Sequence, residues 1–319
     1  MNIEKRKKQK SVAKSDDTAP KKGTIKEKHK RSRQEKAEIR HTSVFMFPSL
    51  AGVLLFFVVP FFIVIVYAFV DNTTNMEFVG FENFSSLLNN SAFQMALRNT
   101  GIFSLISVPL VVILPLMLAL ILDTNIPLKS TFRTIFLSPM VVPAASVILI
   151  WQVLFNYNGV ANDFLALFGV DKIEWFKSDY GIIVVVLLFL WKNIGYNMIM
   201  FMAALSAIPK EIVEVSMLDG CGSFRRFFSI KLRYLVSTIS FVTIMSLINS
   251  FKVFREVYLL TGDYPYESMY TLQHFMNNTF GRFDYQKLSS AALVLSLVMI
   301  LIISVLLWID NRAGKEIEE

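Results

Sequence analysis

The chain has 319 residues, of which 54% are hydrophobic and 18% are charged, and its mean hydropathy is +0.50. In soluble globular domains, about a quarter of all residues are charged. The composition therefore excludes an ordinary soluble domain and favours a membrane protein. The formal net charge of +7 is not spread evenly along the chain.

Residues 1–43 form a strongly basic segment. They contain 15 of the 32 lysines and arginines, six acidic residues and almost no large apolar side chains. Such a segment cannot bury enough surface to offset the entropy of ordering, which predicts a disordered cytoplasmic tail. A tail of this charge is attracted to anionic membrane lipid. We expect no nucleic-acid binding, because no aromatic residues lie among the basic ones. The remaining chain has 17 basic and 19 acidic residues, so its charge says nothing about a substrate.

Six apolar runs follow the tail. A membrane-spanning helix needs about 20 apolar residues. Five runs lack Asp, Glu, Lys and Arg, and they predict spans at 44–70, 101–122, 134–155, 234–251 (short) and 288–309. A sixth run, 181–205, is interrupted only by Lys192. The predicted fold is an all-α polytopic membrane protein with six transmembrane helices, in which a core of residues 71–319 follows the first span.

The orientation follows from the positions of lysine and arginine. The run at 44–70 is about twice as long as a signal-peptide core, which predicts a retained anchor rather than a cleaved signal. Cytoplasmic segments carry an excess of Lys and Arg. With the N-terminus inside, the inner segments hold 24 of these residues and the outer segments seven; without the tail the numbers are nine and seven. We therefore expect both termini inside, which places the 206–233 loop in the cytoplasm.

The 206–233 loop contains a predicted helix and a glycine stop. Pro209 suits the first turn of a helix, and apolar residues recur at three- and four-residue steps over 210–219. Gly220 is typical of the left-handed position that ends a helix. An amphipathic pattern resumes over 224–232. We expect two short helices joined at a glycine elbow, projecting as a knob; the alternative is an ordinary polar loop between spans.

The same loop carries a spaced set of residues. Residues 208–233 read IPKEIVEVSMLDGCGSFRRFFSIKLR, in which a glutamate is followed by glycine six residues later, isoleucine ten further on, and leucine after two more. This resembles the cytoplasmic docking loop of ABC-importer membrane subunits: Glu-Ala-Ala, three residues, Gly, nine residues, Ile-x-Leu-Pro. Val215 and Ser216 replace the alanines, and Arg233 replaces the proline. The resemblance implies ATPase docking through Glu214, Val215, Ser216, Asp219, Gly220, Ile230 and Leu232.

Four flanking blocks resemble the sugar-uptake branch of these permeases, from about residue 80 to residue 310. They read GFENFSSLLNNSAFQMALRNTGIF (80–103), FRTIFLSPMVVPAASVILIWQVLFNYNGVAN (132–162), FLWKNIGYNMIMFMAALSAIP (189–209) and FKVFREVYLLTGDYP (251–265). In the last block, Asp263 and Tyr264 replace two glycines of the usual Leu-Thr-Gly-Gly-Gly-Pro. The resemblance implies the type I ABC-importer permease fold in a bacterial cytoplasmic (inner) membrane.

The resemblance also implies partners. They are a similar second permease, forming a heterodimer, two ATP-binding cassette subunits, and an extracytoplasmic solute-binding protein. The chain has no Gly-x-x-x-x-Gly-Lys-Ser/Thr loop, so we expect ATP hydrolysis on a separate subunit and no enzyme activity here. Its three histidines are scattered and no Cys-x-x-Cys occurs, while the single Cys221 cannot form an internal disulfide. We expect no metal and no cofactor.

Lys192 is the one charge within the apolar runs. Such a charge must face protein or water. Asn193 and Asn197, four residues apart, are expected to share a face of the helix. One interpretation is a pathway lining for a hydroxyl-rich solute; the other is a polar contact between helices, or Lys192 reaching outward to the interface. The candidate pathway residues are Trp191, Lys192, Asn193, Tyr196 and Asn197, with Asn249 and Phe251 as weaker candidates.

Three classes of function compete. The first is a sugar or oligosaccharide ABC import permease, with an ABC permease for a non-sugar solute as its variant. A stand-alone secondary transporter or channel usually has internal repeats or charged relays within its spans, and the sequence has no evident repeat. An intramembrane enzyme needs paired His, Asp or Ser groups at membrane depth, and none occur. The sequence therefore favours the import permease and does not identify its solute.

Overall fold

The computed structural model describes residue 42 and residues 45–124 and 126–318. The described residues fall into two units, which divide between Val58 and Val59. Apart from Thr42, the expected tail (1–43) lies outside the described residues. The described residues are helical apart from turns, loops and one isolated antiparallel bridge, Val70 with Phe78.

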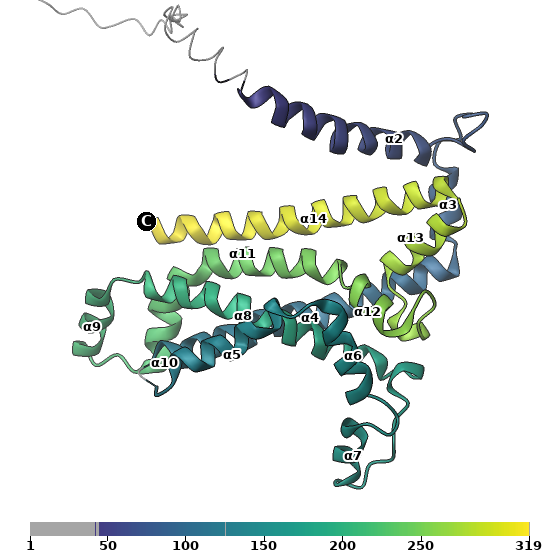
Figure 1. The fold of residues 1–319 in the computed structure, drawn as a ribbon. Coiled ribbons are helices and arrows are strands. Elements are labelled where there is room, and N and C mark those ends of the chain that lie inside the picture. Colours follow the sequence, from purple (N-terminus) through teal and green to yellow (C-terminus); the bar gives the residue numbers. More distant parts are fainter. Residues whose placement is uncertain (1–41, 43–44, 125, 319) are drawn as a thin grey trace, which may run out of the picture. The chain divides into compact units, whose positions relative to one another are not determined.

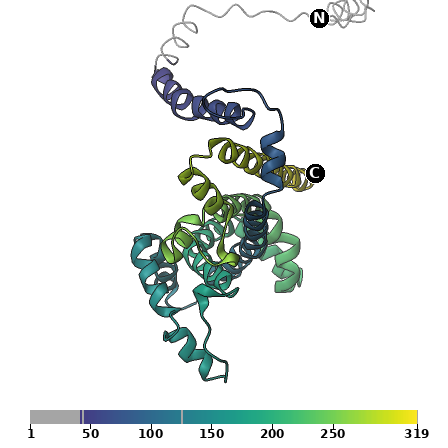
Figure 2. The same cartoon turned by 90° about the vertical axis from the view of Figure 1, so that its right-hand side faces the viewer.

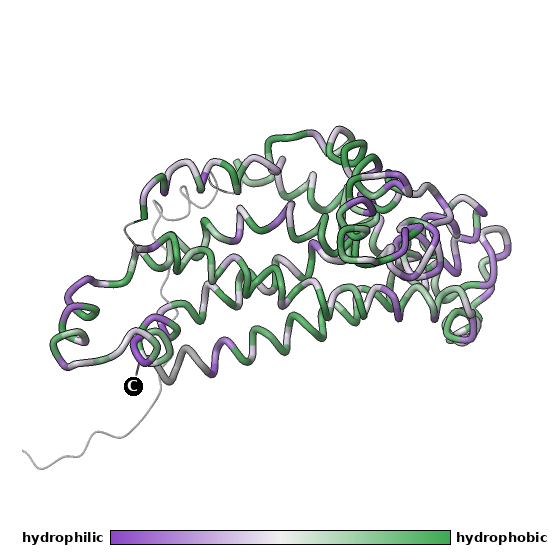
Figure 3. Tube along the Cα trace, turned by 90° about the horizontal axis from the view of Figure 1, so that it is seen from below, coloured by the Kyte–Doolittle hydropathy of each residue, from purple (hydrophilic) through white to green (hydrophobic). Residues whose placement is uncertain are grey.

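Within the described part of the chain, five helices are long and apolar enough to cross a membrane, or six when one bent pair is counted as a span. The first is Phe45–Ala68, which contains a π-helical turn, η1 (Leu54–Val58), and ends in α2 (Val59–Ala68). The others are α4 (Ser91–Asp123), α8 (Gly181–Ser206), the helical stretch Ser223–Thr261 with α11 (Leu232–Phe251) inside it, and α14 (Tyr285–Glu318). Apolar residues predominate along the length of these helices, and polar residues gather at their ends (Figure 3).

Local chemistry defines the helix ends. Asn90 caps α4, and its side-chain oxygen accepts a hydrogen bond from the Phe93 N–H at 3.1 Å. Asp284 does the same before α14, where its carboxylate accepts from the Lys287 N–H at 3.1 Å. Each cap satisfies one of the N–H groups that a helix N-terminus leaves without an intrahelical partner. These caps fix where α4 and α14 begin.

The centre of the second unit is the packing of α4, α8 and α11. Its core contains Val112 from α4, Met198 and Phe201 from α8, and Leu235 from α11, all buried. Figure 2 shows the bundle viewed approximately down the helix axes. Gly195 lets α8 approach a neighbouring helix very closely, because a Cβ at this position would lie 1.9 Å from the Phe136 carbonyl oxygen. The glycine is therefore a packing requirement.

The third expected span, 134–155, is not one straight helix. It forms α5 (Lys129–Val141) and α6 (Ala144–Leu154), which are bent by 101° at the break. Pro143 disfavours helical backbone at the residue before it, and Val142 is extended, with φ −79° and ψ 131°. The expected span at 134–155 is therefore a bent pair of helices, and the length of the apolar run alone did not indicate the bend at Pro143.

Short helices lie at the two ends of the bundle (Figure 1). The 206–233 loop, with α9 (Lys210–Leu218), lies at one end. The other end carries α3, α12 and α13, with α6 and α7 extending from it. The bounds of the remaining short elements are α3 (Glu82–Leu88), α7 (Val160–Ala166), η2 (Trp175–Lys177), α10 (Ser223–Arg226), η3 (Phe227–Lys231), α12 (Phe254–Thr261), η4 (Glu267–Met269) and α13 (Leu272–Gly281).

Candidate functional site

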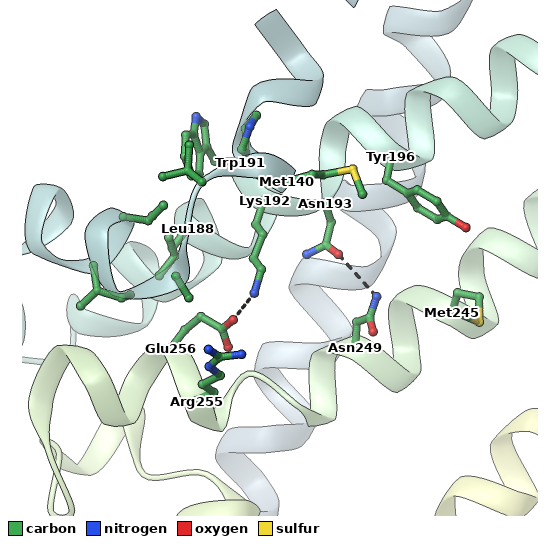
Figure 4. Close-up of a pocket in the computed structure, with 15 residues that line it drawn as sticks. Met140, Leu188, Trp191, Lys192, Asn193, Tyr196, Met245, Asn249, Arg255 and Glu256 are labelled. Carbon is green, nitrogen blue, oxygen red and sulfur yellow. Dashed lines mark hydrogen bonds and ion pairs between the residues drawn. The ribbon is translucent and has the colours of Figure 1, made fainter. Parts of the chain in front are cut away.

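A cavity with both polar and apolar walls opens beside the α5–α6 bend. Its volume is 470 Å³, and its walls come from α5, α6, α8, α11 and α12. Five residues expected to line a pathway contribute side chains to it: Trp191, Lys192, Asn193, Tyr196 and Asn249. Figure 4 shows them around one space, together with Met140, Leu188, Met245, Arg255 and Glu256. The bend at Pro143 therefore creates one wall of the cavity.

Lys192 forms an ion pair with Glu256, which lies in α12 (Figure 4). The Lys192 side chain is 43% exposed, whereas that of Glu256 is only 10% exposed. A buried carboxylate and an intramembrane ammonium are both costly alone, and pairing offsets part of each desolvation. The pair explains how α8 carries a charge. Sequence reasoning missed Glu256, because it lies 64 residues away, in a stretch expected to be an outer loop.

Two amides connect the spans across the cavity. The Asn249 side-chain N–H donates to the Asn193 side-chain oxygen at 3.5 Å, a long contact, while Asn193 also donates to the Phe189 carbonyl at 2.8 Å. Trp191 meets Trp151 edge to face, with ring centroids 6.3 Å apart. The cavity thus offers amide, phenol, indole, ammonium, guanidinium and carboxylate groups. These groups form hydrogen bonds with hydroxyls and provide aromatic surfaces.

Asn197 and Phe251 do not line this cavity. Asn197 is 3% exposed, and its amide donates to the Val111 carbonyl at 2.8 Å and to the Ser246 hydroxyl at 3.1 Å. Four residues advance a helix by about 40° more than a full turn. That offset carries Asn197 into the contact between α4, α8 and α11, away from the face of Asn193. Phe251 instead lines an apolar groove between α4, α11 and α14.

The 206–233 loop begins as the sequence predicts. Helix α9 starts after Pro209, and Gly220 follows it with φ +71°, in the left-handed region. The Cys221 N–H donates to the Ser216 carbonyl at 2.9 Å, and the Gly220 N–H donates to the Met217 carbonyl at 3.1 Å. These two bonds form the Schellman arrangement that closes a helix C-terminus. The expected helix and its glycine stop are confirmed.

The second half of the loop differs from the expected elbow. Helix α10 runs into a π-helical turn, η3, and then into α11 without a break, so no separate second short helix forms. Ile230 belongs to η3 and Leu232 begins α11; both are half-buried. π-Helical turns are rare and often occur at functional positions. The loop is therefore one short capped helix beside the N-terminal end of a long one.

The proposed docking residues differ in exposure. Glu214, Val215, Asp219 and Gly220 are exposed, while Ser216 is buried and donates to the Val213 carbonyl at 2.6 Å. Large apolar side chains nearby are also exposed, which the sequence analysis did not single out: Leu218 at 86%, Phe224 at 79% and Phe228 at 50%. Exposed apolar patches commonly mark protein interfaces. We call Leu218, Phe224 and Phe228 the loop apolar patch.

One ion pair connects this loop to another span. The Lys231 ammonium donates to the Asp123 carboxylate at 2.8 Å, joining the end of η3 to the last residue of α4. No cluster of three or more His, Cys, Asp or Glu side chains that could hold a metal ion occurs in the part of the chain that the structure describes.

A family model described as "Binding-protein-dependent transport system inner membrane component" matches residues 85–318. The chain belongs to this family. The match runs from within α3 to the end of α14, and it includes the cavity beside the α5–α6 bend and the 206–233 loop. This transport component is therefore a multi-pass membrane protein, and the resemblance noted in its sequence blocks is confirmed.

Named relatives of this permease match most of its length. The lactose transport system permease protein LacF of Rhizobium radiobacter is 29% identical, over 86% of this chain and 93% of the relative. The trehalose/maltose transport system permease protein MalF of Thermococcus litoralis is 30% identical, over 80% and 88%. A solved bacterial alginate ABC transporter, in complex with an alginate pentasaccharide-bound periplasmic protein, has a chain with a TM-score of 0.77 and 19% identity, over 88% and 98%. The last match supports the fold alone.

Proposed function

We propose that this permease is one of two membrane subunits of an ATP-driven importer for a sugar or oligosaccharide. An extracytoplasmic solute-binding protein delivers the solute, and a second, similar permease completes the pathway. The observation that carries the proposal is the exposed, glycine-capped α9, with Glu214 and Gly220 in the spacing of an ATPase-docking loop. A permease that works alone has no need of such a loop.

The choice of a sugar rests on the relatives and on the cavity. Several relatives are named for lactose, trehalose/maltose and arabinooligosaccharide transport, and others for sulfoquinovosyl glycerol and sn-glycerol-3-phosphate transport. The cavity volume of 470 Å³ lies within the range of about 300–1,000 Å³ typical of small-molecule sites. Its amides and aromatic rings fit a solute rich in hydroxyls. These features favour a sugar over other solutes of binding-protein-dependent systems.

ATP hydrolysis belongs to two separate cassette subunits, and the assembly lies in a bacterial inner membrane. The exposed loop apolar patch and α9 give those subunits a surface to grip at the cytoplasmic end. Movement of the loop passes into the bundle by two routes. One is the unbroken helix from α10 through η3 into α11, and the other is the ion pair between Lys231 and Asp123.

Two glycines of the same loop provide a matched test. Gly220→Val forces a β-branched residue into the left-handed region, which costs about 1–2 kcal/mol or more and unwinds the end of α9. Gly222→Ala is the control: its φ of −63° suits any residue, and no atom lies within 4 Å of a Cβ there.

The measurement is co-purification of tagged permease with the ATPase subunits, alongside ATP-dependent uptake of labelled oligosaccharides. We expect Gly220→Val to lose ATPase association or uptake, while Gly222→Ala retains both. Normal association and uptake in Gly220→Val contradicts docking through this loop. Uptake by the purified chain alone, driven by an ion gradient, instead supports a secondary transporter.

A further inference from the structure

A second cavity adjoins the first, and its lining is rich in cations. It has a volume of 320 Å³ and shares Lys192, Asn193, Asn249, Arg255 and Glu256 with the larger one. It adds Lys252, which directly follows α11. The charged side chains lining the two cavities are therefore three cations, Lys192, Lys252 and Arg255, and a single anion, Glu256.

The single anion, Glu256, already has an ion-pair partner. Glu256 pairs with Lys192, which leaves Lys252 and Arg255 as excess positive charges. Both side chains are exposed, and neither has an ion-pair or hydrogen-bond partner within the described residues. In Figure 4, Arg255 lies beside Glu256 at the edge of the cavity. Two unneutralised cations therefore border a space large enough for a ligand.

The position of these cations matters as much as their number. Lys252 lies just beyond the end of α11 remote from the 206–233 loop, and Arg255 lies in the first turn of α12. With the loop in the cytoplasm, both flank the outer mouth of the cavity, where a delivered solute arrives. Clefts lined by one sign of charge with low-dielectric walls concentrate ions of the opposite sign.

We propose that the solute is an anionic carbohydrate, a sugar bearing a carboxylate, phosphate or sulfate group, and that Arg255 and Lys252 bind the anionic group. Arg presents a planar fork of donors that matches these anions in two-point contacts, and Lys supplies a point charge. The Lys192–Glu256 pair and the amides of Asn193 and Asn249 are then left for sugar hydroxyls. This inference rests on the proposed function, whose sugar it specifies.

The test uses the assembled transporter in membrane vesicles, with its binding protein and ATP. The probes are a neutral disaccharide and the same disaccharide with one primary hydroxyl oxidised to a carboxylate or esterified as a phosphate or sulfate. We expect ATP-dependent uptake of at least one charged probe in preference to the neutral one. The three charged probes distinguish the possible anionic groups.

Variants locate the effect on this chain. Arg255→Gln and Lys252→Gln are each expected to raise the concentration of charged probe that gives half-maximal uptake by about tenfold, the typical loss of one charge-assisted hydrogen bond. Lys287→Gln is the matched control, because Lys287 is a cation at the same end that pairs with Asp284 at 2.7 Å and lines neither of the two cavities. It is expected to leave uptake unchanged.

Three results are decisive against the proposal. The first is a preference for the neutral probe that Arg255→Gln leaves intact. The second is uptake of a charged probe that neither variant alters, which places its recognition elsewhere. The third is loss of the second permease from Arg255→Gln complexes, which makes Arg255 an intersubunit contact. In contrast, absence of ATP-dependent uptake for every probe and for a panel of neutral oligosaccharides contradicts the proposed function itself.

Discussion

Lys231 and Asp123 form an ion pair, with 2.8 Å between the ammonium nitrogen and the carboxylate oxygen, at the end of the bundle that carries the 206–233 loop. Both side chains are partly buried, at 21% and 31% exposure. The pair joins the π-helical turn of the 206–233 loop to the last residue of α4, a helix that packs along α8 and α11. A movement of the loop is therefore transmitted directly to α4 as well as to α11.

Breaking this pair should uncouple the loop from α4. Asp123→Asn and Lys231→Met are each expected to retain ATPase association, because neither residue belongs to α9 or to the loop apolar patch, while uptake falls several-fold. The exchange variant, with Asp123→Lys and Lys231→Asp together, should recover part of the loss. Uptake and ATP hydrolysis are measured together in vesicles; if both singles transport normally, the pair has no coupling role.

The Lys192–Glu256 pair should behave as a coupled unit in stability. Lys192→Met leaves the poorly exposed Glu256 carboxylate without a partner, and we expect a loss of about 1–3 kcal/mol, less than for a fully buried pair because Lys192 is 43% exposed. Adding Glu256→Gln should restore part of it. Thermal unfolding in detergent of the wild type, the two single variants and the double variant gives a double-mutant cycle. If the losses of the two single variants simply add in the double variant, the two side chains do not interact.

Gly195 should tolerate no larger residue. In Gly195→Ala the new Cβ lies 1.9 Å from the Phe136 carbonyl oxygen, so α5 and α8 must separate, at a cost of about 1–3 kcal/mol. Gly101→Ala is the control, because this helical glycine has no atom within 4 Å of its Cβ position, and the change should be neutral or slightly stabilising. Equal melting temperatures for the two variants would contradict the close approach.

The burial of His274 predicts that the stability of α13 depends on pH. Burial lowers the pKa of His274 from 6.5 to about 4, and its Nδ1 lies 2.8 Å from the Thr271 hydroxyl. The unfolded chain therefore binds the proton more readily than the folded one between about pH 4 and 6.5. The free energy of unfolding should be constant above about pH 6.5 with respect to this group, and should fall as the pH drops toward 4.

Hydrogen exchange of α13 backbone amides between pH 7.5 and 4.5, corrected for intrinsic exchange rates, measures this effect. The His274→Phe variant keeps an aromatic ring beside Phe254, which lies 4.6 Å from the His274 ring, and removes the titration. The variant should lose the acid-induced weakening in α13. An identical pH profile for both proteins assigns the effect to other groups.

Sequence reasoning located most of the fold because the membrane imposes a minimum length of apolar helix. The runs at 101–122 and 181–205 each lie within one helix of the structure. The bend within the run at 134–155 was not predicted, because hydropathy records only the length of an apolar run. The bend comes from the restriction that Pro143 places on the backbone of the preceding residue. Attention to the residue before each proline could have found the bend.

The site was only partly predictable for a different reason. Lys192 was identifiable because a charge within an apolar run needs a partner. Its partner, Glu256, was not, since a pairing over 64 residues depends on how α12 packs against the spans. Asn197 was misplaced because residues four apart on a helix differ in direction enough to face different neighbours. Arg255 and Lys252 gained meaning only once the cavities were visible.

The most direct test of the account is reconstitution in proteoliposomes. The permease is combined with its second permease and ATPase subunits, the solute-binding protein is added outside, and accumulation of labelled oligosaccharide is followed. The account predicts ATP-dependent accumulation that disappears when the binding protein is omitted or when Gly220→Val replaces the permease. Accumulation that persists without ATP or without the ATPase subunits would contradict it.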